Sequence, residues 1–202
     1  SNGNDIDDAT KKQIYEDIYD DSLWLIDMVE NLLAVTRIDE GRMNINLATE
    51  LVGDVIAEAL KHIHTKSAKQ KISVVQLDDL LLAKMDARLI VQVLINLLDN
   101  AIKYTPSDSQ ITITAKRDEN MVNISVADNG DGIPDYQKAH VFDMFYTGKN
   151  KIADCRRSIG LGLSLCKSIV NAHGGEITLT DNVPHGAVFT FTLPVGEVEI
   201  NE

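Results

Sequence analysis

The chain has 202 residues, of which 44% are hydrophobic and 5% aromatic, and its formal net charge is −12. These values predict a folded domain with a smaller attachment and an aliphatic core, and they argue against long disorder. The acidic excess disfavours general binding of nucleic acid or of an anionic membrane surface, because both require a basic surface. The most apolar stretch, residues 89–98, is too short to span a membrane. Cys155 and Cys166 lack a metal-binding spacing, so we expect free thiols in a reducing cytosol.

Residues 11–40 contain neither Gly nor Pro, and their apolar residues repeat with a helical period. The repeat consists of Ile14, Ile18, Leu25, Met28, Leu32 and Val35. This heptad pattern, interrupted at Asp21, predicts one helix of a bundle or coiled coil that ends at Gly41. The alternative is an amphipathic helix that packs on its own domain.

Shorter helices and strands are expected after Gly41. We expect helices at 51–64, 86–104 and 163–172, strands at 72–77, 80–83, 111–116, 121–128, 176–180 and 187–193, and a polar segment at 136–158. Five or six strands with three helices predict an α+β fold, in which one sheet carries helices on one face.

The helix at 86–104 has a polar face that could bind a metal-bound polyphosphate. Gln92, Asn96, Asp99, Asn100 and Lys103 share about a third of its circumference, opposite apolar residues that would face the core. An amide oxygen suits Mg²⁺ when phosphates supply the negative charge, and a lysine can meet phosphate as a point charge. A polar helix face can equally be only solvated.

A glycine-rich turn directly after the strand at 121–128 contains Asp128, Gly130 and Gly132. Glycine permits tight turns and close approach of a ligand. A buried carboxylate at Asp128 could accept a hydrogen bond from the amine of adenine and would repel the carbonyl of guanine. The alternatives are a surface turn or a calcium loop, but no Glu closes an EF-hand loop here.

A second glycine-rich segment, Ser158 to Leu163, precedes the helix at 163–172. Glycines before a helix allow backbone N–H groups to point at phosphate. The segment lacks the Gly-Lys-Ser/Thr ending of a P-loop and the βαβ context of a Rossmann fingerprint.

The order and spacing of these three motifs resemble the N, G1 and G2 boxes of the histidine-kinase ATPase fold, shared more distantly with gyrase, Hsp90 and MutL. Residues 142–145 resemble its F box, and residues 173–175 and 186–194 resemble its last strands. The resemblance implies a two-layer α/β sandwich of the Bergerat type, with a mixed sheet, over residues 46–202. Residues 1–45 resemble the second helix of the dimerisation domain. Within the family, residues 145–158 are similar to the lid of KdpD-type kinases, which govern potassium uptake.

Carried over by position, the resemblance assigns catalytic roles to Asn96, Asn100 and Lys103. Asn100 matches the Mg²⁺ ligand, Lys103 a phosphate contact and Asp128 the aspartate that binds adenine. The implied nucleotide contacts are Asn96, Asn100, Lys103, Tyr104, Asp128, Gly130, Gly132, Ile133, Phe145, Lys149, Arg157, Gly160, Leu161, Gly162 and Leu163. Residues 142–158 match the lid, whose basic side chains, at Lys149, Lys151, Arg156 and Arg157, either contact phosphates or are solvated. Ser158 departs from the Gly found in many kinases.

The resemblance favours a kinase over a hydrolase because gyrase and Hsp90 relatives carry a water-activating Glu where this chain has Asn96, and an amide is no general base. The nucleophile would be a histidine on the first dimerisation helix. None of the five histidines here (His62, His64, His140, His173 and His185) is followed by the family's acceptor motif, so we expect structural roles for them.

The implied cofactors are ATP and Mg²⁺, and the implied partners are a cognate response regulator and a second copy bound through the dimerisation helices. We expect the cytoplasmic part of a membrane sensor protein, attached to the membrane only through segments not present here. The alternatives are a nucleotide-dependent conformational module and a hydrolysing ATPase of the gyrase or Hsp90 type.

Overall fold

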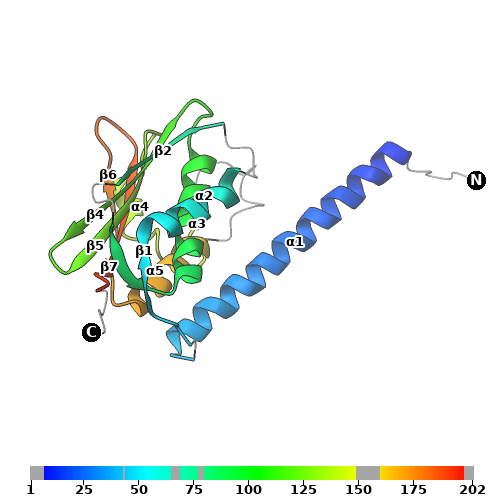
Figure 1. The fold of residues 1–202 in the computed structure, drawn as a ribbon. Coiled ribbons are helices and arrows are strands. Elements are labelled where there is room, and N and C mark those ends of the chain that lie inside the picture. Colours follow the sequence, from blue (N-terminus) through cyan, green and yellow to red (C-terminus); the bar gives the residue numbers. More distant parts are fainter. Residues whose placement is uncertain (1–6, 43, 65–68, 77–79, 149–159, 198–202) are drawn as a thin grey trace, which may run out of the picture.

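A long helix, α1, spans Asp8–Asp39 and projects from the body of the molecule (Figure 1). The structure is a computed structural model that describes residues 7–42, 44–64, 69–76, 80–148 and 160–197. The helix ends where Gly41 adopts a φ of 65° and Arg42 N donates to Arg37 O at 2.8 Å. A glycine in the left-handed region is a common helix stop, because it lacks the Cβ that this conformation disfavours. The predicted helix and its end at Gly41 are confirmed.

The apolar repeat of α1 has two different environments. Ile14, Ile18 and Leu25 are 40%, 57% and 51% exposed, because no described part of the chain covers the N-terminal portion of the helix. Val35 and Ile38 near its C-terminus are 1% and 9% exposed and join the core of the body. The helix therefore docks on the body through its last turns only.

The body contains a five-stranded mixed sheet in the order β2-β4-β5-β7-β6. Only β2 and β4 pair in parallel, and the other neighbours are antiparallel. The strands are β2 (Lys71–Gln76), β4 (Gln110–Asp118), β5 (Met121–Asp128), β6 (Ile177–Asp181) and β7 (Ala187–Pro194). Burial alternates strictly along β5 and β7, so one face of the sheet is buried.

Helices α2 (Val52–His64), α3 (Ala87–Tyr104) and α5 (Gly162–Ala172) cover that buried face (Figure 1). Helix α3 contributes its apolar side to the core, through Leu89, Ile90, Val93, Leu94, Leu97, Leu98 and Ala101. Its opposite side remains available for polar side chains. The predicted α+β sandwich, with helices on one face of a mixed sheet, is confirmed.

The prediction of one sheet was incomplete, because a second sheet of two strands joins β1 (Ala48–Leu51) to β3 (Leu82–Met85). The sequence of β1 has no alternation of apolar and polar residues, so its pairing depends on β3. The predicted strand at 80–83 is two residues early. The described residues contain seven strands rather than five or six. They also contain four helices after α1 rather than three, since α4 (Asp135–Lys138) is a single turn within the segment expected to be irregular.

Candidate functional site

The carboxylate of Asp128 is fixed at the end of β5. This side chain is 8% exposed, and its Oδ1 atom accepts hydrogen bonds from Gly130 N at 2.9 Å and from Ala187 N at 3.3 Å. The Asp128 carbonyl oxygen accepts a further hydrogen bond from Asn182 Nδ2 at 2.7 Å. Two backbone N–H groups thus determine where this carboxylate points, and the predicted buried acid at this turn is confirmed.

The glycines after Asp128 let the turn approach the end of α3. A Cβ atom on Gly130 would lie 2.8 Å from Thr105 Cγ2, so a larger residue would have to displace the Thr105 side chain just after α3. Gly132 has a φ of 75°, and a Cβ there would lie 3.1 Å from Gly186 O. This packing brings the predicted residues Tyr104 and Asp128 to the same end of the molecule, which we call the base end. His185 also lies there, and its Nδ1 atom donates to Gly130 O at 3.0 Å.

The second glycine-rich segment faces the middle of α3. A Cβ on Gly162 would be 3.8 Å from the Asn96 side chain, which places the first turn of α5 beside the polar face of α3. Leu161 is buried before that turn, at 3% exposure. We call the region around Asn96 and Gly162 the phosphate end. Ile133 and Leu163 are half-buried and pack against the core.

The start of the predicted lid meets the second glycine-rich segment just before α5. Phe145 N donates to Gly160 O at 3.0 Å, and both residues have a positive φ, 63° for Phe145 and 72° for Gly160. A Cβ on Gly160 would overlap the backbone of Tyr146, which explains a glycine at this position. The predicted contacts Lys149 and Arg157, together with Lys151 and Arg156, lie outside the described residues.

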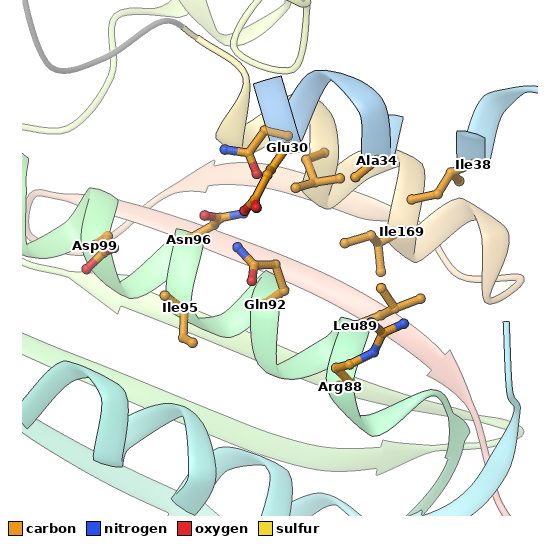
Figure 2. Close-up of a pocket in the computed structure, with 12 residues that line it drawn as sticks. Glu30, Ala34, Ile38, Arg88, Leu89, Gln92, Ile95, Asn96, Asp99 and Ile169 are labelled. Carbon is orange, nitrogen blue, oxygen red and sulfur yellow. The ribbon is translucent and has the colours of Figure 1, made fainter. Parts of the chain in front are cut away.

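A cavity of about 480 Å³ separates α1, α3 and α5 at the phosphate end. Its apolar wall includes Ala34, Ile38, Leu89, Leu165 and Ile169, and its polar wall includes Glu30, Asn31, Arg88, Gln92, Asn96 and Asp99. Figure 2 shows Glu30 extending from α1 toward Asn96 and Gln92 on successive turns of α3. The predicted polar face of α3 is therefore divided, because Gln92, Asn96 and Asp99 line this cavity whereas Asn100 and Lys103 do not.

Lys103 lies toward the base end, where its Nζ atom is 5.2 Å from the centre of the Tyr104 ring. Both side chains are exposed, and Asn100 is half-buried one turn before them. The C-terminal turn of α3 thus presents an amide and an ammonium group, which are suitable partners for phosphate and for a metal bound to it.

Asn96 combines burial with an unused donor. Among the described residues, its Nδ2 atom is the only buried side-chain nitrogen or oxygen without a hydrogen-bond partner. Such an atom is costly unless a ligand or water satisfies it. Burial raises the pKa of the neighbouring Cys166 thiol to about 12. The thiol is therefore neutral and inert near pH 7, in agreement with the predicted free thiol at Cys166.

The amide and ammonium groups at the end of α3 suit a metal ion that arrives with an anionic ligand. In the ranges that the structure describes, no three His, Cys, Asp or Glu side chains gather closely enough to hold a metal ion. The amide of Asn100 fits a Mg²⁺ ion that phosphates already coordinate, because the ion then requires few protein ligands. The described part of the chain also contains no helix with the length and apolar character needed to cross a bilayer.

Sequence reasoning missed several residues of the site. Glu30 and Asn31 reach the cavity from a helix distant in sequence, which no local pattern indicates. Arg88 could have been included, because it lies one turn before Gln92 on the same face of α3. His185 was expected to have a structural role, and its hydrogen bond to Gly130 O agrees with that expectation.

A family model described as histidine kinase-, DNA gyrase B-, and HSP90-like ATPase matches residues 85–197. That range contains the Asp128 turn, the Gly-x-Gly segment before α5 and the polar face of α3. The chain belongs to this family. Residues 85–197 are accordingly part of an ATP-binding domain of the family, and the family resemblance noted in the sequence is confirmed.

The similar proteins within the family are sensor kinases. The chain is 42% identical over 193 residues to the sensor protein KdpD of Clostridium acetobutylicum, and the match covers 96% of this chain but 21% of that protein. The nucleotide-free catalytic domain of the histidine kinase ThkA superposes with a TM-score of 0.64 at 31% identity, over 74% of this chain and 98% of the domain. ThkA in complex with the response regulator TrrA matches 96% of this chain and 54% of its own, with a TM-score of 0.72 and 27% identity.

Proposed function

We propose that this chain is the ATP-binding catalytic part of a sensor histidine kinase, and that it transfers the γ-phosphate of ATP to a histidine of a dimerisation domain. Residues 46–202 are the catalytic domain, and residues 1–45 are the second helix of the dimerisation domain. The sensor kinase relatives support this assignment, and the chain spans only about a fifth of KdpD, so the parent protein supplies the remaining parts.

The observation that carries the proposal is the side chain of Asn96. Its Nδ2 atom is buried without a partner beside Gly162, at the end of the site where phosphates would lie. An amide can donate a hydrogen bond to a phosphate oxygen, but it cannot remove a proton from water. A site with an amide here keeps the terminal phosphate for another nucleophile and does not hydrolyse it.

At the base end, Asp128 accepts a hydrogen bond from the exocyclic amine of adenine. Its Oδ1 atom already receives two backbone N–H groups, so the carboxylate is oriented before the nucleotide arrives. Pre-oriented groups lose less conformational freedom on binding. Tyr104, Gly130, Gly132 and Ile133 border the nucleotide at this end.

At the phosphate end, Asn100 and Lys103 on α3 and the backbone of Gly160, Leu161 and Gly162 position the phosphates. A Mg²⁺ ion held through the phosphates and Asn100 would neutralise their charge. Leu163, Phe145, Lys149 and Arg157 complete the nucleotide contacts. Catalysis by such a site depends on positioning and charge neutralisation rather than on a protein nucleophile.

The partners that we propose are a cognate response regulator and a second copy of the parent protein. The ThkA–TrrA complex supports the first, because its kinase chain matches 96% of this chain. The exposed apolar repeat of α1 supports the second, since Ile14, Ile18 and Leu25 need a helical partner to be buried. The chain would then lie in the cytoplasm, as part of a membrane sensor.

The test is to mix the chain with labelled ATP, Mg²⁺ and a separate acceptor-helix fragment of a sensor kinase. We expect an acid-labile phosphohistidine on the fragment and no label on the chain itself. Steady release of inorganic phosphate by the chain alone would instead indicate a hydrolysing ATPase. Tight ATP binding with an unlabelled fragment would indicate a conformational module.

A further inference from the structure

Three segments that are distant in sequence meet at a buried polar junction formed by Asp86 and His173. Asp86 precedes α3, His173 follows α5, and Asn46 belongs to the segment that connects α1 with the body. Asp86 is 8% and His173 is 3% exposed. Buried polar side chains of this kind are costly unless each of their groups has a partner, so their bonds can be accounted for individually.

The hydrogen bonds of His173 determine its protonation. Its Nε2 atom accepts from Asp86 N at 3.0 Å, so that atom carries no hydrogen. Its Nδ1 atom lies 2.7 Å from Ile169 O, and a carbonyl oxygen only accepts, so Nδ1 carries the hydrogen. The ring is therefore neutral, and it links the last turn of α5 to the residue before α3.

The carboxylate of Asp86 has two separate partners. Its Oδ1 atom accepts from Leu89 N at 3.3 Å, which caps the N-terminus of α3. Its Oδ2 atom accepts from Asn46 N at 3.2 Å, which ties the segment after α1 to the same residue. A cap alone would require only the first of these bonds.

We propose that Asp86 and His173 are positioning residues that set the relative placement of α3 and α5, and that tie both helices to the segment after α1. These helices carry the two walls of the phosphate end, Asn96 on α3 and Gly162 at the start of α5. Each wall lies about 15 Å from the junction, at 1.5 Å per helical residue. Because helices are stiff, a change at the junction shifts these distant walls. The role in nucleotide binding rests on the function proposed above.

Two substitutions test the two hydrogen bonds of the His173 ring one at a time. In His173→Gln, the side-chain amide reaches about as far as Nε2 and can still accept from Asp86 N. In His173→Asn, the shorter amide can replace Nδ1 toward Ile169 O but cannot reach Asp86. The control is Val122→Ala, which removes buried volume at the end of β5 remote from the site and destabilises the fold without touching the junction.

Affinity for a fluorescent ATP analogue, corrected for the folded fraction, is the first measurement. We expect His173→Asn to weaken binding about tenfold, whereas His173→Gln and Val122→Ala remain within about twofold of the unsubstituted chain. A His173→Asn variant that is folded and binds as tightly as the unsubstituted chain would overturn the proposal.

Amide hydrogen exchange is the second measurement, and it does not require ATP binding. We expect His173→Asn to speed exchange at Asn46 and also in the first turn of α5, about 15 Å away. Faster exchange only at residues that touch His173 would overturn the proposal and leave an ordinary buried histidine. If the unsubstituted chain binds no nucleotide, the proposed function fails, and the exchange pattern still decides the role of the junction.

Discussion

The two ends of the proposed nucleotide site differ in how their side chains are held. At the base end, Asp128 is fixed by the backbone N–H groups of Gly130 and Ala187, and the glycines around it leave little space for a Cβ. At the phosphate end, helices enclose an open cavity, and Asn96 Nδ2 has no partner. The base end thus has its hydrogen bonds in place without a ligand, whereas the phosphate end has a buried donor, Asn96 Nδ2, that a ligand or water must satisfy. Nucleotide selectivity and the reactivity of the terminal phosphate are therefore expected to respond differently to substitution.

The largest effect is expected at Gly186, which supports the base end. It has a φ of 116°, and a Cβ would overlap the Asp128 carbonyl group. We expect Gly186→Ala to lower the free energy of unfolding by about 3 kcal/mol or more, measured by urea denaturation. The matched control is Gly41→Ala, with a φ of 65° and no atom within 4 Å, for which only about 1 kcal/mol is expected. Equal losses in both variants would show that the base end is not closely packed.

Asp128→Asn tests whether the base end reads adenine. The Asn side-chain oxygen can still accept the backbone hydrogen bonds, so the fold should persist. The side chain has lost its negative charge, however, and its NH₂ group can donate to the carbonyl of guanine. We expect ATP affinity to fall about tenfold and the preference for ATP over GTP to narrow, measured by calorimetric titration with each nucleotide. Asp131→Asn, an exposed position in the same turn, is the control. Unchanged selectivity at Asp128 would remove it from base recognition.

Asn100→Asp tests the phosphate end through its charge. The new carboxylate repels metal-free ATP, so we expect affinity in the presence of a chelator to fall about tenfold. Added Mg²⁺ should restore much of this loss, because the ion binds between the carboxylate and the phosphates. Asn171→Asp, an exposed residue of α5, makes the same charge change elsewhere. The same affinity at every Mg²⁺ concentration would place Asn100 outside the site.

The smallest effect is expected from Glu30, which approaches the phosphate end from α1. Removing its charge reduces repulsion between the cavity wall and a polyphosphate, so Glu30→Gln should raise ATP affinity about threefold at low salt. Glu16→Gln, on the exposed part of the same helix, should leave the affinity unchanged. Titrations at two ionic strengths check both expectations, and a salt-independent gain at Glu30 would contradict the electrostatic explanation.

The sequence predicts well those site residues that lie close together along the chain. It predicts poorly the residues that distant segments bring to the site. The polar face of α3 and the Asp128 turn follow from helical spacing and glycine positions within one short segment. The role of Glu30 does not, because it depends on where α1 docks. Similarly, the stop after α5 was predicted from Gly174 and Gly175, but the bond between His173 and Asp86 joins two helix ends that no local rule brings together. Strand β1 was missed for the same reason, since its partner β3 creates it.

The hydrogen bond between Phe145 and Gly160 also bears on how the family can diversify. Because a backbone contact fixes both ends of the intervening segment, its length can change without moving the strands or helices on either side. In general, doubling the length of a chain segment whose ends are held together costs only about 0.6 kcal/mol in closure entropy. Evolution could therefore insert, delete or exchange sequence between these two residues at little cost to folding. Protein engineers could use the same position to graft an additional segment.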